Sequence, residues 1–226
     1  MRPSPQPERI APFANREEAA LLLADNLKTY RNADAVVLTV QSGDASMGNL
    51  VAAHLGLRSM VMPCREIRHP ANRNQSIGSV CLRNVVLRDV GRDIPQEYLQ
   101  HAIARLRAKI LRDMREGGKD LPVENYRGKN VIIVSDWLKT ADHILACLNH
   151  IREEGPARII VATAVVSPQA IVELRNLVDE LIYLVEDDEV SLPQYYFGPE
   201  QDDQRQGAGR GPISHTVPVR PTRHYA

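Results

Sequence analysis

Polar side chains follow a short apolar run near the middle of the chain. The run VIIV at 131–134 is followed by Ser135, Asp136, Lys139 and Thr140, and then by a helical pattern. Backbone N–H groups at the start of a helix, together with hydroxyls and a lysine, attract a phosphate, and a carboxylate accepts hydrogen bonds from sugar hydroxyls. The stretch therefore raises the question of whether it holds a phosphorylated sugar.

A second set of polar side chains lies just downstream and has the spacing of metal ligands. His143, Cys147 and His150 stand at i, i+4 and i+7, on one side of the helix that this segment predicts. Imidazole and thiolate suit zinc or copper. The alternative is that Cys147 is a core thiol beside Ile144 and Leu148, with the histidines flanking it. The sequence leaves both interpretations open and favours the core thiol.

Two further polar stretches permit chemistry but favour simpler interpretations. Ser42 lies beside Gly43 and Asp44, yet it lacks the Gly-x-Ser-x-Gly pattern of a nucleophile, so a turn is expected. The acidic run at 186–189 has the ligands of a hard cation, but a solvated run of charge is the more common case.

Helix and strand patterns alternate along the chain. Strands are predicted at 35–40, 130–134, 158–166 and 180–185, and helices at 15–30, 50–55, 95–117, 144–151 and 168–177. Near-continuous apolar strands separated by helices predict an α/β fold, with a twisted, mainly parallel sheet and helices on both faces. Ligands bind at the carboxyl ends of such strands, which directs attention to the stretches 41–46, 64–76 and 135–143.

Composition limits the classes of partner. Of the 226 residues, 43% are hydrophobic and 25% charged, and the formal net charge is zero, so nucleic acid is not expected as a partner. No apolar run approaches the ~20 residues that span a bilayer, so a membrane is not expected either. The three cysteines are an odd number in a long chain, which predicts free thiols and a cytoplasmic location.

The two ends of the chain differ from its centre. Residues 1–12 are rich in proline and are predicted to form a flexible arm. Residues 199–226 lack apolar periodicity and are predicted to be a disordered tail. A single folded domain is expected over 13–198. One alternative role for the protein is assembly, in which the tails bind a partner protein.

The order of these elements resembles the type I phosphoribosyltransferase fold, the fold of a family of bacterial phosphoribosyltransferase-domain proteins. That family has a buried strand, two acidic residues, a glycine and a Thr-Gly-x-Thr loop before a helix. The strand at 131–134 fits, and Asp136 and Thr140 match the second acid and the first threonine. The stretch 64–80 resembles the family's Arg-Lys-Ile loop, and 194–196 its Gln-aromatic-Tyr signature. The resemblance implies a small hood over the carboxyl ends of the strands, built from the 64–90 segment and the 190s, and a homodimer.

Several chemically important positions depart from the family pattern. Ser135 replaces the first acid and Trp137 the glycine, while Ala141 and Asp142 stand in the phosphate loop. Asp142 is expected to cap the free N–H groups of the following helix and so to repel a phosphate. After its first strand the family usually carries a Pro-Arg-Gly-Gly turn that approaches pyrophosphate; here Ser42 stands in place of the arginine and Asp44 adds a negative charge after Gly43. In the stretch 64–80, Glu66 stands where a lysine is usual. The changes remove positive charge from the site.

The sequence thus predicts a phosphoribosyltransferase-like protein with a degenerate site, acting as a non-catalytic binding or regulatory module. The alternative is a divergent phosphoribosyltransferase that transfers phosphoribosyl from phosphoribosyl pyrophosphate, with Mg²⁺, to a nitrogenous acceptor. If a phosphorylated or nucleotide ligand is bound, the resemblance implies that it contacts the following residues: Asp136, Thr140, Lys139, Ser135, Gly43, Ser42 and Arg65.

Overall fold

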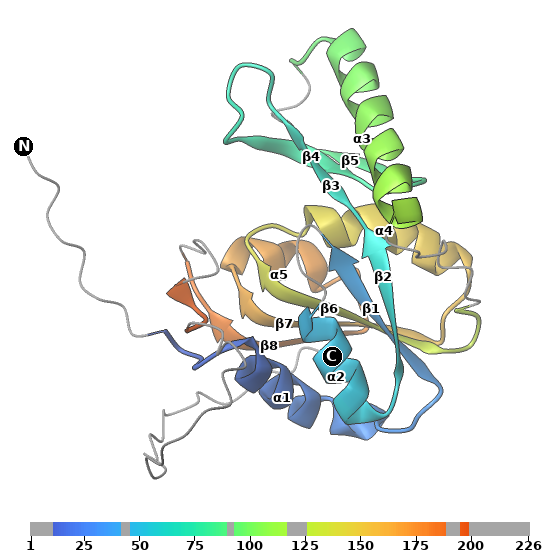
Figure 1. Cartoon of the computed structure of the whole chain (residues 1–226), viewed down its shortest axis with the longest axis vertical. Coiled ribbons are helices and arrows are strands. Elements are labelled where there is room, and N and C mark those ends of the chain that lie inside the picture. Colours follow the sequence, from blue (N-terminus) through green and yellow to red (C-terminus); the bar gives the residue numbers. More distant parts are fainter. Residues whose placement is uncertain (1–10, 42–45, 90–92, 117–125, 189–194, 199–226) are drawn as a thin grey trace, which may run out of the picture.

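The structure is a computed structural model and describes residues 11–41, 46–89, 93–116, 126–188 and 195–198. A parallel sheet forms its centre. From edge to edge this sheet contains β2 (Arg58–Pro63), β1 (Ala35–Gln41), β6 (Asn130–Leu138), β7 (Arg158–Val166) and β8 (Glu180–Glu186), as Figure 1 shows. The apolar runs of the inner strands β1, β6 and β7 are buried, which explains why they are continuous. The predicted fold class is confirmed.

Helices cover both faces of this sheet. The helices α1 (Arg16–Asn26) and α2 (Ser46–Leu55) pack on one face, against alternate residues such as Val37 and Ile132. The helices α4 (Asp142–Glu153) and α5 (Pro168–Leu174) pack on the other, against residues such as Leu38 and Ile133. Because side chains alternate along a strand, one apolar run supplies two separate core layers.

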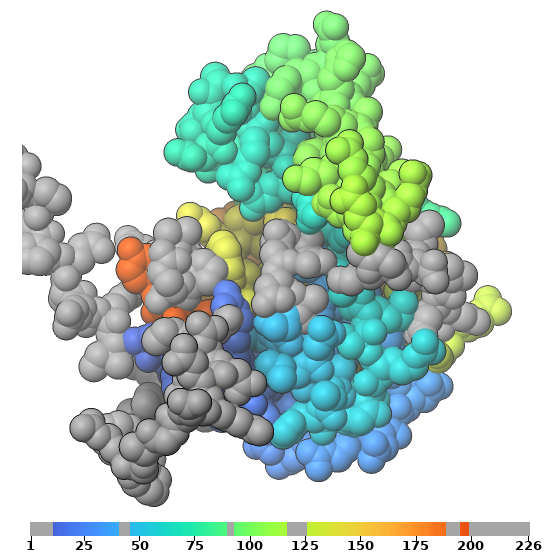
Figure 2. All heavy atoms as spheres, viewed as in Figure 1, coloured from blue at the N-terminus to red at the C-terminus, as the bar shows by residue number. Residues whose placement is uncertain are grey.

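The hood is a small antiparallel sheet with one long helix. Its strands are β3 (Arg65–Arg68), β4 (Ser76–Val80) and β5 (Val85–Leu87), and α3 (Gln96–Glu116) packs across them. Figures 1 and 2 show that this unit projects from the body of the molecule. Residues 195–198 do not join this sheet, because Phe197 pairs with Phe13 at the other side of the body. Residues 190–194 lie outside the described residues.

Local signals explain where several elements begin and end. The side chain of Asn15 accepts a hydrogen bond from the backbone N–H of Glu18, and Glu18 in turn accepts one from the N–H of Ala14, which fixes the start of α1. The long helix α3 begins directly after Pro95, whose fixed φ suits the start of a helix. None of the described helices is both long and apolar enough to cross a bilayer.

The central strand β6 is longer than its apolar run. It continues through Ser135 and Trp137 to Leu138, because Ser135 pairs with Thr163 and Leu138 with Val166 of β7. The backbone ladder to β7 therefore continues after the apolar side chains stop. As a result the segment between β6 and α4 has only three residues, 139–141. The helix α5, by contrast, ends at Leu174, earlier than the predicted 177.

Candidate functional site

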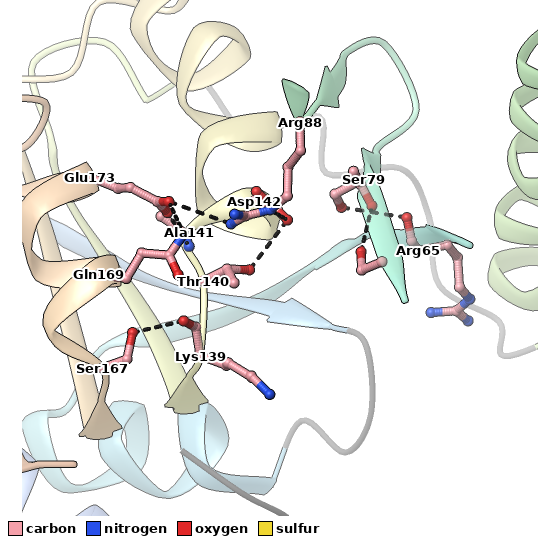
Figure 3. A network of polar contacts seen from close by, with 12 residues as sticks. Arg65, Ser79, Arg88, Lys139, Thr140, Ala141, Asp142, Ser167, Gln169 and Glu173 are labelled. Atoms are coloured by element: carbon pink, nitrogen blue, oxygen red, sulfur yellow. Dashed lines mark hydrogen bonds and ion pairs between the residues drawn. The ribbon is translucent and has the colours of Figure 1, made fainter. Parts of the chain in front are cut away.

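The loop 139–141 lies at the carboxyl end of β6, where ligands bind in open parallel sheets. The backbone carbonyl of Lys139 accepts a hydrogen bond from the hydroxyl of Ser167, at 2.7 Å. Ser167 also caps α5 by accepting from the N–H of Ala170, at 3.0 Å. The loop is therefore attached to the start of α5, and the side chain of Lys139 points away from the polar network around it (Figure 3).

An internal charge network occupies the beginning of α4. The carboxylate of Asp142 is only 3% exposed and lies 2.7 Å from Nε of Arg88, which comes from the segment after β5. The hydroxyl of Thr140 donates to the same carboxylate oxygen at 3.2 Å. Arg88 also lies 3.5 Å from Glu173 of α5. Figure 3 shows the three charged side chains converging on one point.

Glu173 binds the backbone of the loop 139–141. Its Oε2 accepts a hydrogen bond from the backbone N–H of Ala141 at 2.9 Å, and Gln169 donates to its Oε1 at 2.8 Å. The expectation that Asp142 caps the N–H groups of α4 is therefore wrong in detail. Asp142 is bound to Arg88 and Thr140, and the carboxylate on the loop N–H belongs to Glu173.

The network holds Arg88 firmly in its charged form. Burial alone would lower the pKa of Arg88, but the hydrogen bond and negative charge of Asp142, with the further charge of Glu173, outweigh burial and raise it. Arg88 thus faces two carboxylates with a single positive charge. The three side chains together leave an excess of negative charge at the beginning of α4.

Asp136, the best match to the acidic pair, is also engaged by the protein itself. Its Oδ2 lies 2.8 Å from Nε of Arg16, at the start of α1, and its side chain is 14% exposed. Arg16 in turn lies over the ring of Phe197, 5.1 Å from the ring centre. The neighbouring Ser135 donates to the carbonyl of Trp137 at 3.1 Å, and Trp137 is half-buried against the core layer of α1 and α2.

The remaining predicted ligand contacts do not meet at this loop. Arg65 lies 2.7 Å from Asp113 of α3, so it joins β3 to α3 within the hood. Figure 3 shows its guanidinium directed away from Thr140 and Asp142. Glu66 pairs with Arg68. Ser42 and Gly43 lie outside the described residues, so their predicted roles stay predictions.

His143, Cys147 and His150, considered as a possible metal site, do not form a ligand group among the described residues, and Cys147 is buried in the core as the favoured interpretation expected. Cys147 lies instead beside two other cysteines, since its Sγ is 3.2 Å from the Sγ of Cys64 and 3.2 Å from that of Cys81. Within the described part of the chain, the imidazole atoms His143 Nε2 and His150 Nδ1 are buried without a partner, and burial lowers the pKa of His143. Cys64 and Cys81 form a disulfide, so the prediction of free thiols is wrong for these two.

Sequence reasoning missed Arg16, Arg88 and Glu173, which contact Asp136, Asp142 and the N–H of Ala141. Each comes from a segment far along the chain from the residue that it contacts: the sequence separation is 120 for Arg16 and Asp136, and 54 for Arg88 and Asp142. A charged residue near the end of a predicted strand or helix is common. Nothing local distinguished these three from solvated charges.

Comparison with known proteins gives the family to which the fold is similar. The model of the phosphoribosyl transferase domain family matches residues 14–196. Among solved structures, the protein TT1426 from Thermus thermophilus is 27% identical with a TM-score of 0.64, over 81% of this chain and 89% of the other. A purine phosphoribosyltransferase from Pyrococcus horikoshii is 14% identical with a TM-score of 0.47, over 77% of this chain and 84% of the other.

Proposed function

Because this chain belongs to the phosphoribosyl transferase domain family, we propose that it is a member whose phosphoribosyl site is closed by its own side chains. In this proposal the protein is a non-catalytic binding or regulatory module. The observation that carries it is the hydrogen bond from the N–H of Ala141 to Glu173. In the family pattern the loop N–H groups hold the 5′-phosphate, and here a carboxylate of α5 already uses one of them.

Charge supports the same conclusion. A phosphate placed at the loop would meet the carboxylates of Asp142 and Glu173, with Arg88 shared between them. Two unit charges about 4 Å apart interact by roughly 4 kcal/mol near a protein surface, so each extra carboxylate opposes binding substantially. An anionic ligand must also displace Glu173 from the N–H of Ala141 before it can bind there.

The sugar side of the site is occupied in a similar way. Ribose hydroxyls would donate to the carboxylate of Asp136, yet that carboxylate lies 2.8 Å from Nε of Arg16. Ser135, in place of the first acid, gives its own hydrogen to the carbonyl of Trp137. A charged acceptor forms hydrogen bonds of about 1.5 to 3 kcal/mol, and a neutral one about half as much. The ribose of a ligand would therefore gain little hydrogen-bond energy at Ser135 and Asp136.

Titration calorimetry with phosphoribosyl pyrophosphate, with and without Mg²⁺, tests the proposal. We expect no binding heat from the wild-type protein. The variant Glu173→Ala should show measurable binding, because it frees the N–H of Ala141 and removes one negative charge. Gln169→Ala is the matched control, since Gln169 lies on the same helix and touches Glu173 without reaching the loop. Micromolar, Mg²⁺-dependent binding to the wild type contradicts the proposal.

That contrary result supports the alternative function, a divergent phosphoribosyltransferase. In that case Asp136→Ala, with its fold intact, abolishes turnover with a nitrogenous acceptor. A panel of nucleoside monophosphates, run in the same calorimetric series, identifies any ligand of a retained binding module. The proposal also includes a homodimer, tested by sedimentation, and a cytoplasmic location, tested by cell fractionation.

A further inference from the structure

Three cysteines from three different segments meet in the core between the hood and the main sheet. Cys64 lies between β2 and β3, Cys81 follows β4, and Cys147 lies within α4. Their exposed fractions are 0%, 3% and 1%, and all three belong to the apolar cluster under α4 and α5. Cys64 and Cys81 are joined as a disulfide, and Cys147 is a free thiol.

Backbone structure, and not the disulfide alone, holds these residues together. Arg65 pairs with Val80 in the antiparallel ladder, so Cys64 and Cys81 occupy the next pair of facing positions. Their Cα atoms are 4.5 Å apart, the spacing of about 4.5 Å expected for a non-hydrogen-bonded pair in such a ladder. Cys147 is carried by α4, which packs on β4. The three sulfur atoms therefore remain neighbours when the disulfide is reduced.

The position of Cys147 does not suit thiol–disulfide exchange. A thiolate attacks a disulfide along the axis of the bond that breaks. Cys147 Sγ is 3.2 Å from each of the two bonded sulfur atoms, and equal distances place it beside the bond and off that axis. The three sulfur atoms instead surround one common point.

We infer that Cys64, Cys81 and Cys147, once the disulfide is reduced, form a three-thiolate site for a soft trivalent ion of the arsenic(III) class. Their ligand atoms lie within 4.8 Å of one another, and among the described residues no other potential ligand joins this group. Thiolates are the ligands that soft ions prefer. The inference is independent of the function proposed for the phosphoribosyl loop.

Charge selects the trivalent ion. The pocket is apolar, and an uncompensated charge in such a pocket costs several kcal/mol or more. Three thiolates neutralise a trivalent ion completely. They leave a net charge of −1 around zinc and −2 around copper(I). Zinc additionally requires a fourth ligand, which the cluster lacks among the described residues. Arsenous acid is itself neutral, so it enters an apolar core without losing the hydration of a charge.

The chemistry balances as follows. A dithiol reductant transfers two electrons and two protons to the disulfide and becomes a disulfide itself. Three thiols then react with one molecule of arsenous acid: three As–S bonds form, three As–O bonds break, and the thiol protons leave with the hydroxyls as three molecules of water.

Native mass spectrometry of the full chain, reduced and then mixed with arsenite without oxygen, tests the inference. We expect one arsenic atom gained with three hydrogen atoms lost. Cys147→Ala keeps the Cys64 and Cys81 pair and is the matched control. Its affinity for arsenite should fall at least about tenfold, since even the loss of a supporting contact to a ligand costs 10- to 100-fold. Circular dichroism establishes that the variant remains folded.

Two results overturn the inference. One is equal binding of arsenite by the wild type and Cys147→Ala, because two thiols then suffice. The other is binding of Zn²⁺, in the same reduced sample, more tightly than arsenite, because neutrality then does not govern the site. A Cys64→Ala variant provides a second measurement if Cys147→Ala fails to fold, and it should lose arsenite binding equally.

Discussion

Arg88 lies between the carboxylates of Asp142 and Glu173, which would otherwise repel each other. Its removal should therefore lower the free energy of unfolding. In Arg88→Ala, Asp142, which is 3% exposed in the wild type, loses its cationic partner while Glu173 stays nearby. Removing one member of a buried ion pair typically destabilises a protein by about 3 to 5 kcal/mol. We expect a loss of this size in urea denaturation. Arg88→Lys keeps the charge and should lose less. A loss under about 1 kcal/mol for Arg88→Ala would show that the network contributes little.

Tyr30 should make the free energy of unfolding depend on pH in the alkaline range. Burial, followed by its hydrogen bond to Glu180 at 2.6 Å and the charge of Glu180, raises the pKa of Tyr30 from 10.0 to about 12. The folded state therefore favours the neutral phenol. Its contribution is fully present below pH 10 and is lost as the pH rises towards 12.

Denaturation followed between pH 9 and pH 12 measures this contribution. A shift of this size corresponds to roughly 2 to 3 kcal/mol of stability at most. Tyr30→Phe is the matched variant, since it lacks the titrating hydroxyl and keeps the ring. The stability of Tyr30→Phe should depend less on pH in this window, and identical profiles for the two proteins contradict the assignment.

A disulfide joins the residue before β3 to the residue after β4 at the base of the hood. The disulfide between Cys64 and Cys81 closes a loop with a sequence separation of 17. A disulfide across a loop of this length stabilises a protein by about 3 kcal/mol, mainly by restricting the unfolded chain. Reduction should lower the free energy of unfolding by this amount in wild type and Cys147→Ala alike. The double variant Cys64→Ala with Cys81→Ala should not respond to the reductant.

The elements show which features the sequence determines locally. The start of α1 was predicted from Asn15 and Glu18, and the two ends of α3 from Pro95 and Gly117, because these signals lie within a few residues of the feature. The end of β6 was placed too early. Its apolar run stops at Val134, but pairing with β7 continues to Leu138, and that pairing depends on a distant strand.

The sequence predicted where the candidate site lies and which of its positions depart from the family pattern, but not which side chains contact it. Asp136 and the loop 139–141 lie where the sequence placed them, at the end of a central strand. The side chains that contact Asp136, Asp142 and the loop N–H come from α1, from the segment after β5 and from α5, and these segments meet only in the folded chain. The Cys64 and Cys81 pair was missed for the same reason, because it follows from the strand register.

The two ends of the described chain are held together across the molecule. The N–H of Phe13 donates to the carbonyl of Tyr196, and the N–H of Gly198 donates to the carbonyl of Phe13. The rings of Phe13 and Phe197 stack with their centres 5.7 Å apart, and Arg16 lies over Phe197. Arg16 therefore contacts both this closure, through Phe197, and the carboxylate of Asp136.

Two truncated chains test the closure. The chain 1–198 retains Tyr196 and Phe197 and should melt at the same temperature as the full protein. The chain 1–194 loses both, and Phe197 is a core residue, 4% exposed, of the kind whose truncation to alanine costs about 3 to 5 kcal/mol. For a protein of this size that loss lowers the melting temperature by roughly 6 to 20 °C. Equal melting of the two truncated chains would show that the closure contributes no stability.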